Sequence, residues 1–188
     1  MRLLAFAFCL GLASASVHAE SDEIGLLEIF NYYEYSPRLL SSGQPTREQY
    51  PAIANAGIEA VINLAPVTEP GAYADEGDIA TGLGLDYVHI PIDWEAPTRA
   101  DLEAFFAAME RFEAKRVLVH CYANARASAF VYLWRTLRAG ADNSEAQATM
   151  IEIWDWNQGY ELNKVAHWER FVTDARRELA ASAHPAGR

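Results

Sequence analysis

Short apolar runs alternate with amphipathic stretches along most of this chain. Three runs of apolar and β-branched residues predict buried strands, at 60–64, 85–92 and 117–119. Other segments carry apolar residues at helical spacing and predict helices, at 46–56, 75–83, 98–112, 127–138, 144–154 and 162–179. This alternation of strand and helix predicts an α/β fold, in which a central, mostly parallel sheet of four to five strands is flanked by helices.

Local signals refine the first third of the chain. Residues 39–43 predict a short edge strand, and the aromatic cluster at 31–35 is interpreted as core packing. Thr46 and Gln49 have the spacing of a capping box at the start of a helix. Pro51 falls late in the first turn of that helix, so a restart or kink is predicted there.

The N-terminal residues have the pattern of an export signal. Arg2 precedes an apolar run at 3–12, and small residues close the segment at 17–19. This pattern predicts a secretory signal over residues 1–19, cleaved after Ala19, because the apolar run is too short to span a bilayer. The mature protein is therefore expected in the periplasm or outside the cell, with no membrane insertion after cleavage.

The remainder predicts one domain over residues 20–180 and a disordered tail at 181–188. We find no repeat, low-complexity tract or linker within it. The formal net charge is −11, and removal of Arg2 with the signal makes the mature chain more negative still. Lysines and arginines are scattered, so the chain lacks the basic surface of a protein that binds nucleic acid or an anionic membrane.

The sequence contains two cysteines, Cys9 and Cys121. Cys9 lies inside the predicted signal, so the mature chain keeps Cys121 alone. In an oxidising compartment this cysteine has no partner within its own chain and can remain a thiol. No group of histidine, cysteine and acidic residues has metal-ligand spacing, and we predict neither a metal nor another cofactor.

The stretch after the strand at 117–119 carries the candidate chemistry. The strand turns directly into a helix, and Cys121 and Arg126 lie in the turn. Successive backbone N–H groups between them can converge on one point at the helix N-terminus, which attracts anions. The same positive potential favours a thiolate at Cys121 and therefore a nucleophile. The predicted anion-binding residues are Tyr122, Ala123, Asn124, Ala125 and Arg126.

The segment from His120 through Arg126 to Ser128 resembles the signature loop of cysteine-dependent protein tyrosine and dual-specificity phosphatases. More narrowly, it resembles a bacterial subgroup related to the phosphatase-like domain of β-lactamase-hydrolase-like proteins, whose loops read close to H-C-A-x-N-x-R-x-S-A. The phrase S-S-G-Q-P-T at 41–46 is also typical of that subgroup. The broad family has five residues between the cysteine and the arginine, whereas this chain has four. Asn124 stands where the usual glycine would be, and asparagine can also adopt positive φ.

The resemblance implies a fold like that of dual-specificity phosphatases and hydrolysis of a phosphate monoester through a phosphocysteine. Cys121 would be the nucleophile, while Arg126 and the loop amides would bind the phosphate. Asp93 follows a strand of the predicted parallel sheet, at the carboxyl edge where ligands bind, and it is the candidate general acid. Glu95 could replace it. The substrate would be a phosphorylated protein or a small phosphate ester.

Several other residues have both a functional and a structural interpretation. His120 is expected either to orient the loop or to be an ordinary core histidine. Ser128 could hydrogen-bond the cysteine sulfur or be a plain first-turn helix residue. His89 is interpreted as core. Asn157 and Gln158 could position the hydrolytic water or simply pack.

Two other functions fit the shorter loop. Rhodanese-like sulfurtransferases also surround a cysteine with backbone amides, and their loop is shorter than that of the phosphatases, so Cys121 could carry a persulfide. A catalytically inactive pseudophosphatase that only binds phosphate is the second alternative. The Asp93 loop, the phrase at 41–46 and His120 favour the phosphatase.

Overall fold

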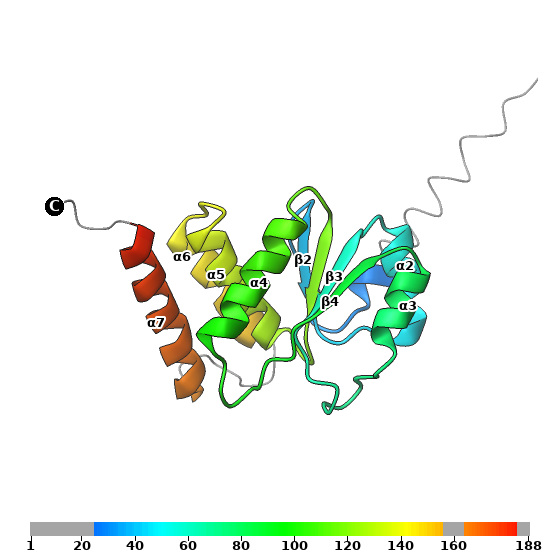
Figure 1. The fold of residues 1–188 in the computed structure, drawn as a ribbon, viewed down its shortest axis with the longest axis horizontal. Coiled ribbons are helices and arrows are strands. Elements are labelled where there is room, and N and C mark those ends of the chain that lie inside the picture. The colour runs from blue at the N-terminus through cyan, green and yellow to red at the C-terminus, as the bar shows by residue number, and fades with distance from the viewer. Residues whose placement is uncertain (1–24, 156–163, 184–188) are drawn as a thin grey trace, which may run out of the picture.

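A computed structural model describes residues 25–155 and 164–183. One five-stranded sheet, in the order β1-β2-β5-β3-β4, forms its centre (Figure 1). β1 runs antiparallel to β2, and the other neighbouring strands are parallel. The mostly parallel α/β fold predicted from the sequence is therefore confirmed. The strands are β1 (Tyr33–Ser36), β2 (Leu39–Ser42), β3 (Ala60–Asn63), β4 (Asp86–His89) and β5 (Val117–His120).

Helices cover both faces of the sheet. A larger group lies on one face and α2 and α3 lie on the other (Figure 1). The larger group consists of α4 (Arg99–Arg111), α5 (Ala125–Leu137), α6 (Asn143–Asp155) and α7 (Ala166–Ala183). A short 3₁₀ helix, η1 (Arg47–Gln49), leads into α2 (Tyr50–Asn55), and α3 (Glu76–Gly82) follows β3.

Each face of the sheet has its own hydrophobic core. In β5, Val117 and Val119 belong to the core under α4–α7, whereas Leu118 belongs to the core under α2 and α3. Ile62 and Val61 divide between the two cores in the same way. Because successive side chains of a strand point to opposite faces, a strand buried on both sides must be apolar throughout. This explains the continuous apolar runs in the sequence.

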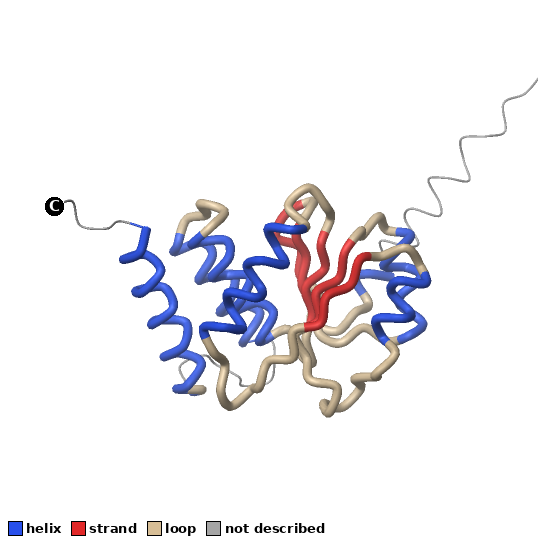
Figure 2. The backbone as a smooth tube through the Cα atoms, in the orientation of Figure 1, coloured by secondary structure: helices blue, strands red, loops and turns tan. Residues whose placement is uncertain are grey.

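The parallel strands bring their carboxyl ends to one edge. β5 lies between β2 and β3, and Val117 pairs with Leu39 on one side and with Ala60 on the other. The loops that follow β3, β4 and β5 therefore leave the same edge of the sheet, and long loops gather at the lower end of the sheet in Figure 2. Residues expected to act together follow these strands.

One prediction about the first strands is wrong. Residues 39–43 were expected to form an edge strand, but β2 is buried and paired on both sides, to β1 and β5. The edge strand is β1, and the predicted core packing of the aromatic cluster at 31–35 is confirmed in part, because Tyr32 and Tyr35 pack against the two cores. Pro37 and Arg38 lie between the two strands, so the chain folds back as a hairpin that the apolar pattern alone did not reveal.

The helix starts predicted at Thr46 and Thr98 are confirmed. The N–H of Thr46 donates to Gln49 Oε1 at 2.9 Å, which is half of a capping box, and a second box joins Thr98 and Asp101. Pro51 occupies the first turn of α2, where its missing N–H costs nothing, and the chain changes there from 3₁₀ to α geometry. The predicted break at Pro51 is therefore present.

The ends of the chain lie partly outside the described residues. The predicted signal at 1–19, Asn157 and Gln158 fall there. α7 extends to Ala183, which places 181–183 of the predicted tail in a helix, because its alanine-rich sequence favours helix continuation. In the described ranges, no helix combines the length and the apolar character needed to cross a membrane.

Candidate functional site

The turn between β5 and α5 has an unusual backbone that suits an anion. Asn124 is the N-cap of α5 and adopts the left-handed conformation, with φ of 68°, as its place in the loop predicted. The N–H of Cys121 still pairs with Ser42 O at 3.3 Å. Within the described part of the chain, no acceptor is found for the N–H groups of Tyr122 and Ala125. These donors lie at the positive end of a helix dipole.

A cavity of about 240 Å³ lies against this turn and brings two predicted residues together. Cys121 and Arg126 both line it, and the thiol of Cys121 is free and buried. The remaining walls are Glu69, Pro70, Trp94, Tyr122, Ala123 and Ala125. A free thiol and a guanidinium therefore share one small cavity at the N-terminus of a helix.

The guanidinium of Arg126 is almost completely buried, at 3 % exposure. Its Nη1 donates to Leu64 O at 3.2 Å, its Nη2 pairs with the Glu69 carboxylate, and its carbon lies 5.7 Å from the centre of the Trp94 ring. Its Nε has no hydrogen-bond acceptor among the described residues. A planar guanidinium can use its remaining N–H groups to bind oxyanions.

Glu69 is a cavity residue that the sequence analysis missed. It lies on the loop between β3 and α3, and its carboxylate is the ionic partner of Arg126. Its Oε2 is buried and has no donor among the described residues. A loop rich in proline and glycine gives no sequence signal that one of its acidic residues folds back toward the cysteine. An incoming phosphate would meet this carboxylate and compete with it for Arg126.

A second missed residue, Asn31, holds the loop from outside. Asn124 Nδ2 donates to Asn31 O at 2.6 Å, while Asn31 Nδ2 donates to Ala123 O at 3.1 Å and to Ile153 O at 3.2 Å. Asn31 is itself left-handed, with φ of 48°. These reciprocal amide contacts fix the turn against α6. An asparagine ahead of an aromatic run gives only a weak indication of such a contact.

The loop after β4 carries the predicted general acid. Asp93 is exposed, and its Oδ1 accepts a hydrogen bond from the Glu95 N–H at 3.0 Å. The next residue, Trp94, lines the cavity, and its carbonyl accepts hydrogen bonds from Trp168 Nε1 and His167 Nε2, both at 2.9 Å. Asp93 therefore lies beside the cavity without lining it, and its acid role stays a prediction. Glu95 lines a different cavity, with Arg99 and His167.

The remaining predicted residues take structural positions. His120 is fully buried at the end of β5, and burial lowers its pKa to about 4 against the opposing attraction of Glu76. Ser128 Oγ donates to Ala125 O at 3.0 Å, which is the ordinary first-turn arrangement that the sequence left open. His89 Nε2 lies 2.7 Å from Ala65 O, in agreement with a core role.

Among the residues that the structure describes, no three histidine, cysteine or acidic side chains lie close enough together to hold a metal ion. The absence of a metal cofactor stays a prediction.

Comparisons with known proteins define the class. TpbA of P. aeruginosa has a similar fold: it superposes with a TM-score of 0.61 at 17% identity, covering 80% of this chain and 91% of TpbA. A family described as DSP-PTPase phosphatase fused to NAD+ kinase matches residues 28–173. The chain belongs to this family, as the signature loop indicated.

More similar relatives agree with this assignment. A DUF442 protein of Shewanella putrefaciens CN-32 has 38% identity and a TM-score of 0.72, over 82% of this chain and 94% of that protein. A β-lactamase hydrolase-like protein of Agrobacterium fabrum is 30% identical over 134 residues. That match covers 70% of this chain but 30% of the relative, so the chain spans about a third of the curated relatives that it matches.

The left-handed residue Asn124 generates a stability prediction. Asn124→Ala should lower the free energy of unfolding by about 2–3 kcal/mol, because a Cβ-bearing residue without a local polar group is strained at this φ and the bond to Asn31 is lost. Asn124→Gly should cost about 1 kcal/mol, because only the hydrogen bond is lost. Urea unfolding measures both. Equal losses in the two variants would contradict the role given to the backbone.

Buried His120 generates a pH prediction. Its folded-state pKa of about 4 lies below the unfolded value of about 6.5, so the unfolded chain binds more protons between these values. The stabilising contribution is therefore complete above pH 6.5 and is lost as pH falls toward 4, by on the order of 3 kcal/mol. Urea unfolding at several pH values should show this loss in the wild type and a shallower slope in His120→Gln. Identical slopes would show that His120 does not titrate in this way.

Proposed function

We propose that this protein is a cysteine-dependent phosphatase that hydrolyses a phosphate monoester through a phosphocysteine intermediate. The observation that carries the proposal is the shared cavity: Cys121 and Arg126 line the same 240 Å³ space at the N-terminus of α5. Membership of the phosphatase family supports it. Family membership also favours it over the sulfurtransferase alternative, which shares the amide-lined cysteine and fits the shorter loop.

The first chemical step uses the groups that line the cavity. Cys121 Sγ attacks phosphorus, the bond from phosphorus to the ester oxygen breaks, and that oxygen leaves with its electron pair. Arg126 and the amides of the turn bind the non-bridging oxygens. These donors are already in place before the reaction and stabilise the negative charge of the transition state. Asp93, in the loop beside the cavity, supplies the proton that the leaving oxygen needs.

In the second step a water molecule attacks the phosphocysteine. The sulfur–phosphorus bond breaks, the electron pair returns to Cys121, and inorganic phosphate is released. Asp93, now deprotonated, accepts the proton of the water, as microscopic reversibility requires. The enzyme returns to its starting state without an oxidant, a reductant or a second substrate.

The walls of the cavity support a flat, aromatic substrate group. Trp94, Tyr122 and Pro70 surround the space above Cys121, and Tyr122 is 49% exposed. Aromatic and proline rings pack well against a planar ring. We therefore propose an aryl phosphate, such as a phosphotyrosine side chain or a small phenolic ester. TpbA, whose fold the chain shares, has been solved in complex with pTyr.

We also propose that the protein acts after export, in the periplasm or outside the cell. The support is the charged residue, apolar run and small-residue finish of residues 1–19. A reduced Cys121 in that compartment is compatible with the absence of a second cysteine from the proposed mature chain.

A second candidate is a phosphate-binding pseudophosphatase. The observation behind it is the signature loop, which has four residues between Cys121 and Arg126 and Asn124 in place of the usual glycine. A chain that binds phosphate without turning it over would show protection of Cys121 by phosphate but no release of phosphate from an aryl ester.

The proposal is tested by turnover of p-nitrophenyl phosphate. Cys121→Ser should abolish turnover, because the nucleophile is lost, and Asp93→Asn should lower kcat by roughly 10²-fold or more, because the general acid is lost. Glu95→Gln is the matched control, since Glu95 is a carboxylate of the same loop that faces another cavity, and it should leave kcat unchanged.

Three results would overturn parts of this account. Full activity in Cys121→Ser would remove the phosphocysteine. Formation of thiocyanate from thiosulfate and cyanide without phosphatase activity would favour the sulfurtransferase. If the wild type binds phosphate but does not hydrolyse the ester, the pseudophosphatase would be the remaining candidate function.

The ion pair in the cavity generates a further prediction. Glu69→Gln keeps an oxygen that accepts from Arg126 but removes a negative charge from a cavity that must hold a dianion. The inhibition constant of inorganic phosphate should therefore fall about fivefold, which corresponds to about 1 kcal/mol of tighter binding. Competitive inhibition of p-nitrophenyl phosphate turnover measures it. Weaker phosphate binding in Glu69→Gln would mean that the charge of Glu69 is needed to hold Arg126 in place.

A further inference from the structure

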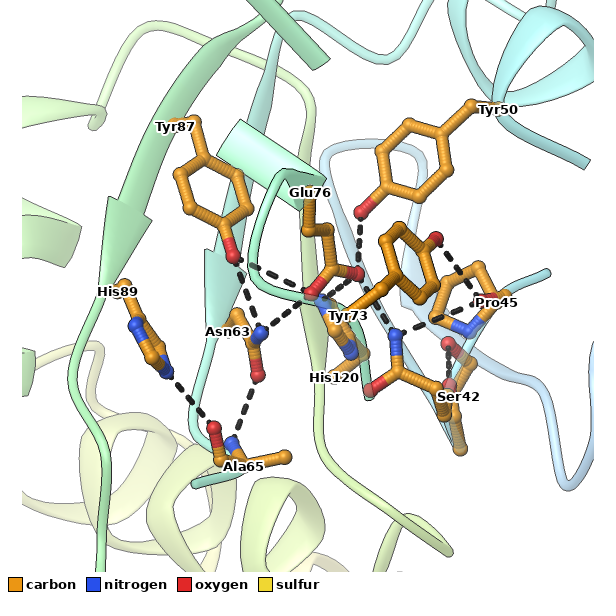
Figure 3. Close-up of polar contacts among 12 residues, drawn as sticks. Ser42, Pro45, Tyr50, Asn63, Ala65, Tyr73, Glu76, Tyr87, His89 and His120 are labelled. Carbon is orange, nitrogen blue, oxygen red and sulfur yellow. Dashed lines mark hydrogen bonds and ion pairs between the residues drawn. The ribbon is translucent and has the colours of Figure 1, made fainter. Parts of the chain in front are cut away.

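Glu76 is a buried carboxylate that neither the sequence analysis nor the proposed mechanism uses. It is the first residue of α3 and is 2 % exposed. Four donors converge on its two oxygens (Figure 3): Gln44 Nε2 at 2.7 Å, Tyr50 OH at 2.8 Å, Asn63 Nδ2 at 2.6 Å and Tyr87 OH at 3.3 Å. A carboxylate accepts about four hydrogen bonds, so this one is fully satisfied.

Three of the four donors lie in or after different strands, and the fourth, Tyr50, begins α2. Gln44 follows β2, Asn63 ends β3 and Tyr87 belongs to β4. His120, the last residue of β5, places its Nε2 3.3 Å from Glu76 Oε1. One carboxylate therefore contacts a residue in or directly after each of the four parallel strands, on the side of the sheet opposite the larger helix group. Figure 3 shows the tyrosines, Asn63 and His120 gathered around it.

The residues held by Glu76 in turn hold the proposed phosphate loop. The N–H of Gln44 donates to Tyr122 O at 3.0 Å. Asn63 Oδ1 accepts from the Ala65 N–H at 2.7 Å, which fixes the chain around Leu64, the residue whose carbonyl accepts from Arg126. His120 is covalently joined to Cys121. Through these connections, Gln44, Asn63 and His120 are each linked to a residue that lines the cavity.

We infer that Glu76 is a positioning residue for the phosphate loop: by joining the ends of the four parallel strands, it sets Cys121, Tyr122 and Arg126 in their working arrangement. The inference rests on the proposed function for what the loop does, but the arrangement itself is structural. Glu76 acts through Gln44, Asn63 and His120.

The physical basis is that a buried carboxylate must be fully hydrogen-bonded. Taking it out of water is costly, and its donors are equally costly to leave unpaired. Glu76→Gln keeps the shape of the side chain but replaces one acceptor oxygen by an NH₂ group. That group would face either Gln44 Nε2 or Asn63 Nδ2, both of which only donate, so one of these two amides must rotate or move away. A shift of the loop by a fraction of an ångström is enough to slow a reaction that depends on alignment.

The test compares Glu76→Gln with the wild type by two measurements. One is kcat for p-nitrophenyl phosphate. The other is the concentration of inorganic phosphate that half-protects Cys121 from alkylation by iodoacetamide, which does not require turnover. Glu76→Gln should lower kcat about tenfold or more and raise the protecting concentration severalfold, while urea unfolding remains cooperative.

Tyr132→Phe is the matched control. It removes a hydrogen bond of similar length, from Tyr132 OH to Asn143 Oδ1 at 2.8 Å, between α5 and α6. This contact lies away from the Glu76 cluster. The variant should lower stability but leave kcat and phosphate protection unchanged.

A swapped pair tests the positioning role directly. In the double variant Gln44→Glu and Glu76→Gln, the two side chains exchange roles: the amide at position 76 donates to the carboxylate at position 44. The cluster keeps one negative charge. This variant should recover most of the lost kcat. If Glu76→Gln does not fold, Gln44→Ala takes its place, because it removes only the link between Glu76 and the segment that holds Tyr122. It should lower kcat and phosphate protection in the same direction.

The outcomes separate this inference from the proposed function. Wild type without turnover and without phosphate protection would defeat the proposed function before any variant is compared. An active wild type together with a Glu76→Gln variant of unchanged kcat and protection, but lower stability, would show that Glu76 only stabilises the fold and would overturn the inference. A swapped pair as impaired as the single variant would also count against it.

Discussion

The burial of Arg126 is the constraint on which the site depends. A guanidinium that is removed from water needs an opposite charge and hydrogen-bond acceptors within the protein. Arg126 finds three partners: the carbonyl of Leu64, the carboxylate of Glu69 and the ring of Trp94. These residues lie in the loops after β3 and β4. The positive charge of Arg126 and the amides at the start of α5 together favour binding of an anion next to Cys121. The strand order places all these groups at one edge.

This arrangement bears on how an acidic chain would bind the proposed phosphate substrate. The overall charge repels anions, so attraction must come from a small region of positive potential with walls that exclude water. The cavity supplies that region, but Glu69 partly neutralises it at rest. A phosphate dianion must compete with one carboxylate for the guanidinium. Under the proposed function, the cavity would favour phosphates that carry a ring, because Trp94 and Tyr122 line it and can contact such a group.

Much of the fold and the centre of the site could be predicted from the sequence, because the signals are local. Apolar runs and caps marked the strands and helices, and Cys121 and Arg126 stand five positions apart in one turn. The missed residues depend on distant partners. Glu69 meets Arg126 across 57 positions and Asn31 meets Asn124 across 93. Glu76 has no sequence signal at all, since an acidic residue at the start of a helix is common on protein surfaces. The edge strand β1 was missed because its alternation of aromatic and polar residues spans only four positions, Tyr33–Ser36.

The most direct test of the account is a crystal structure of the protein with orthovanadate, an oxyanion that resembles the transition state of phosphoryl transfer. The account predicts the vanadium beside Cys121 Sγ, with its oxygens bonded to Arg126 and to the backbone N–H groups of the turn, and with Glu69 displaced from at least part of the guanidinium. An empty cavity at saturating vanadate, or an anion bound away from Cys121 while Arg126 keeps all its present partners, would contradict it.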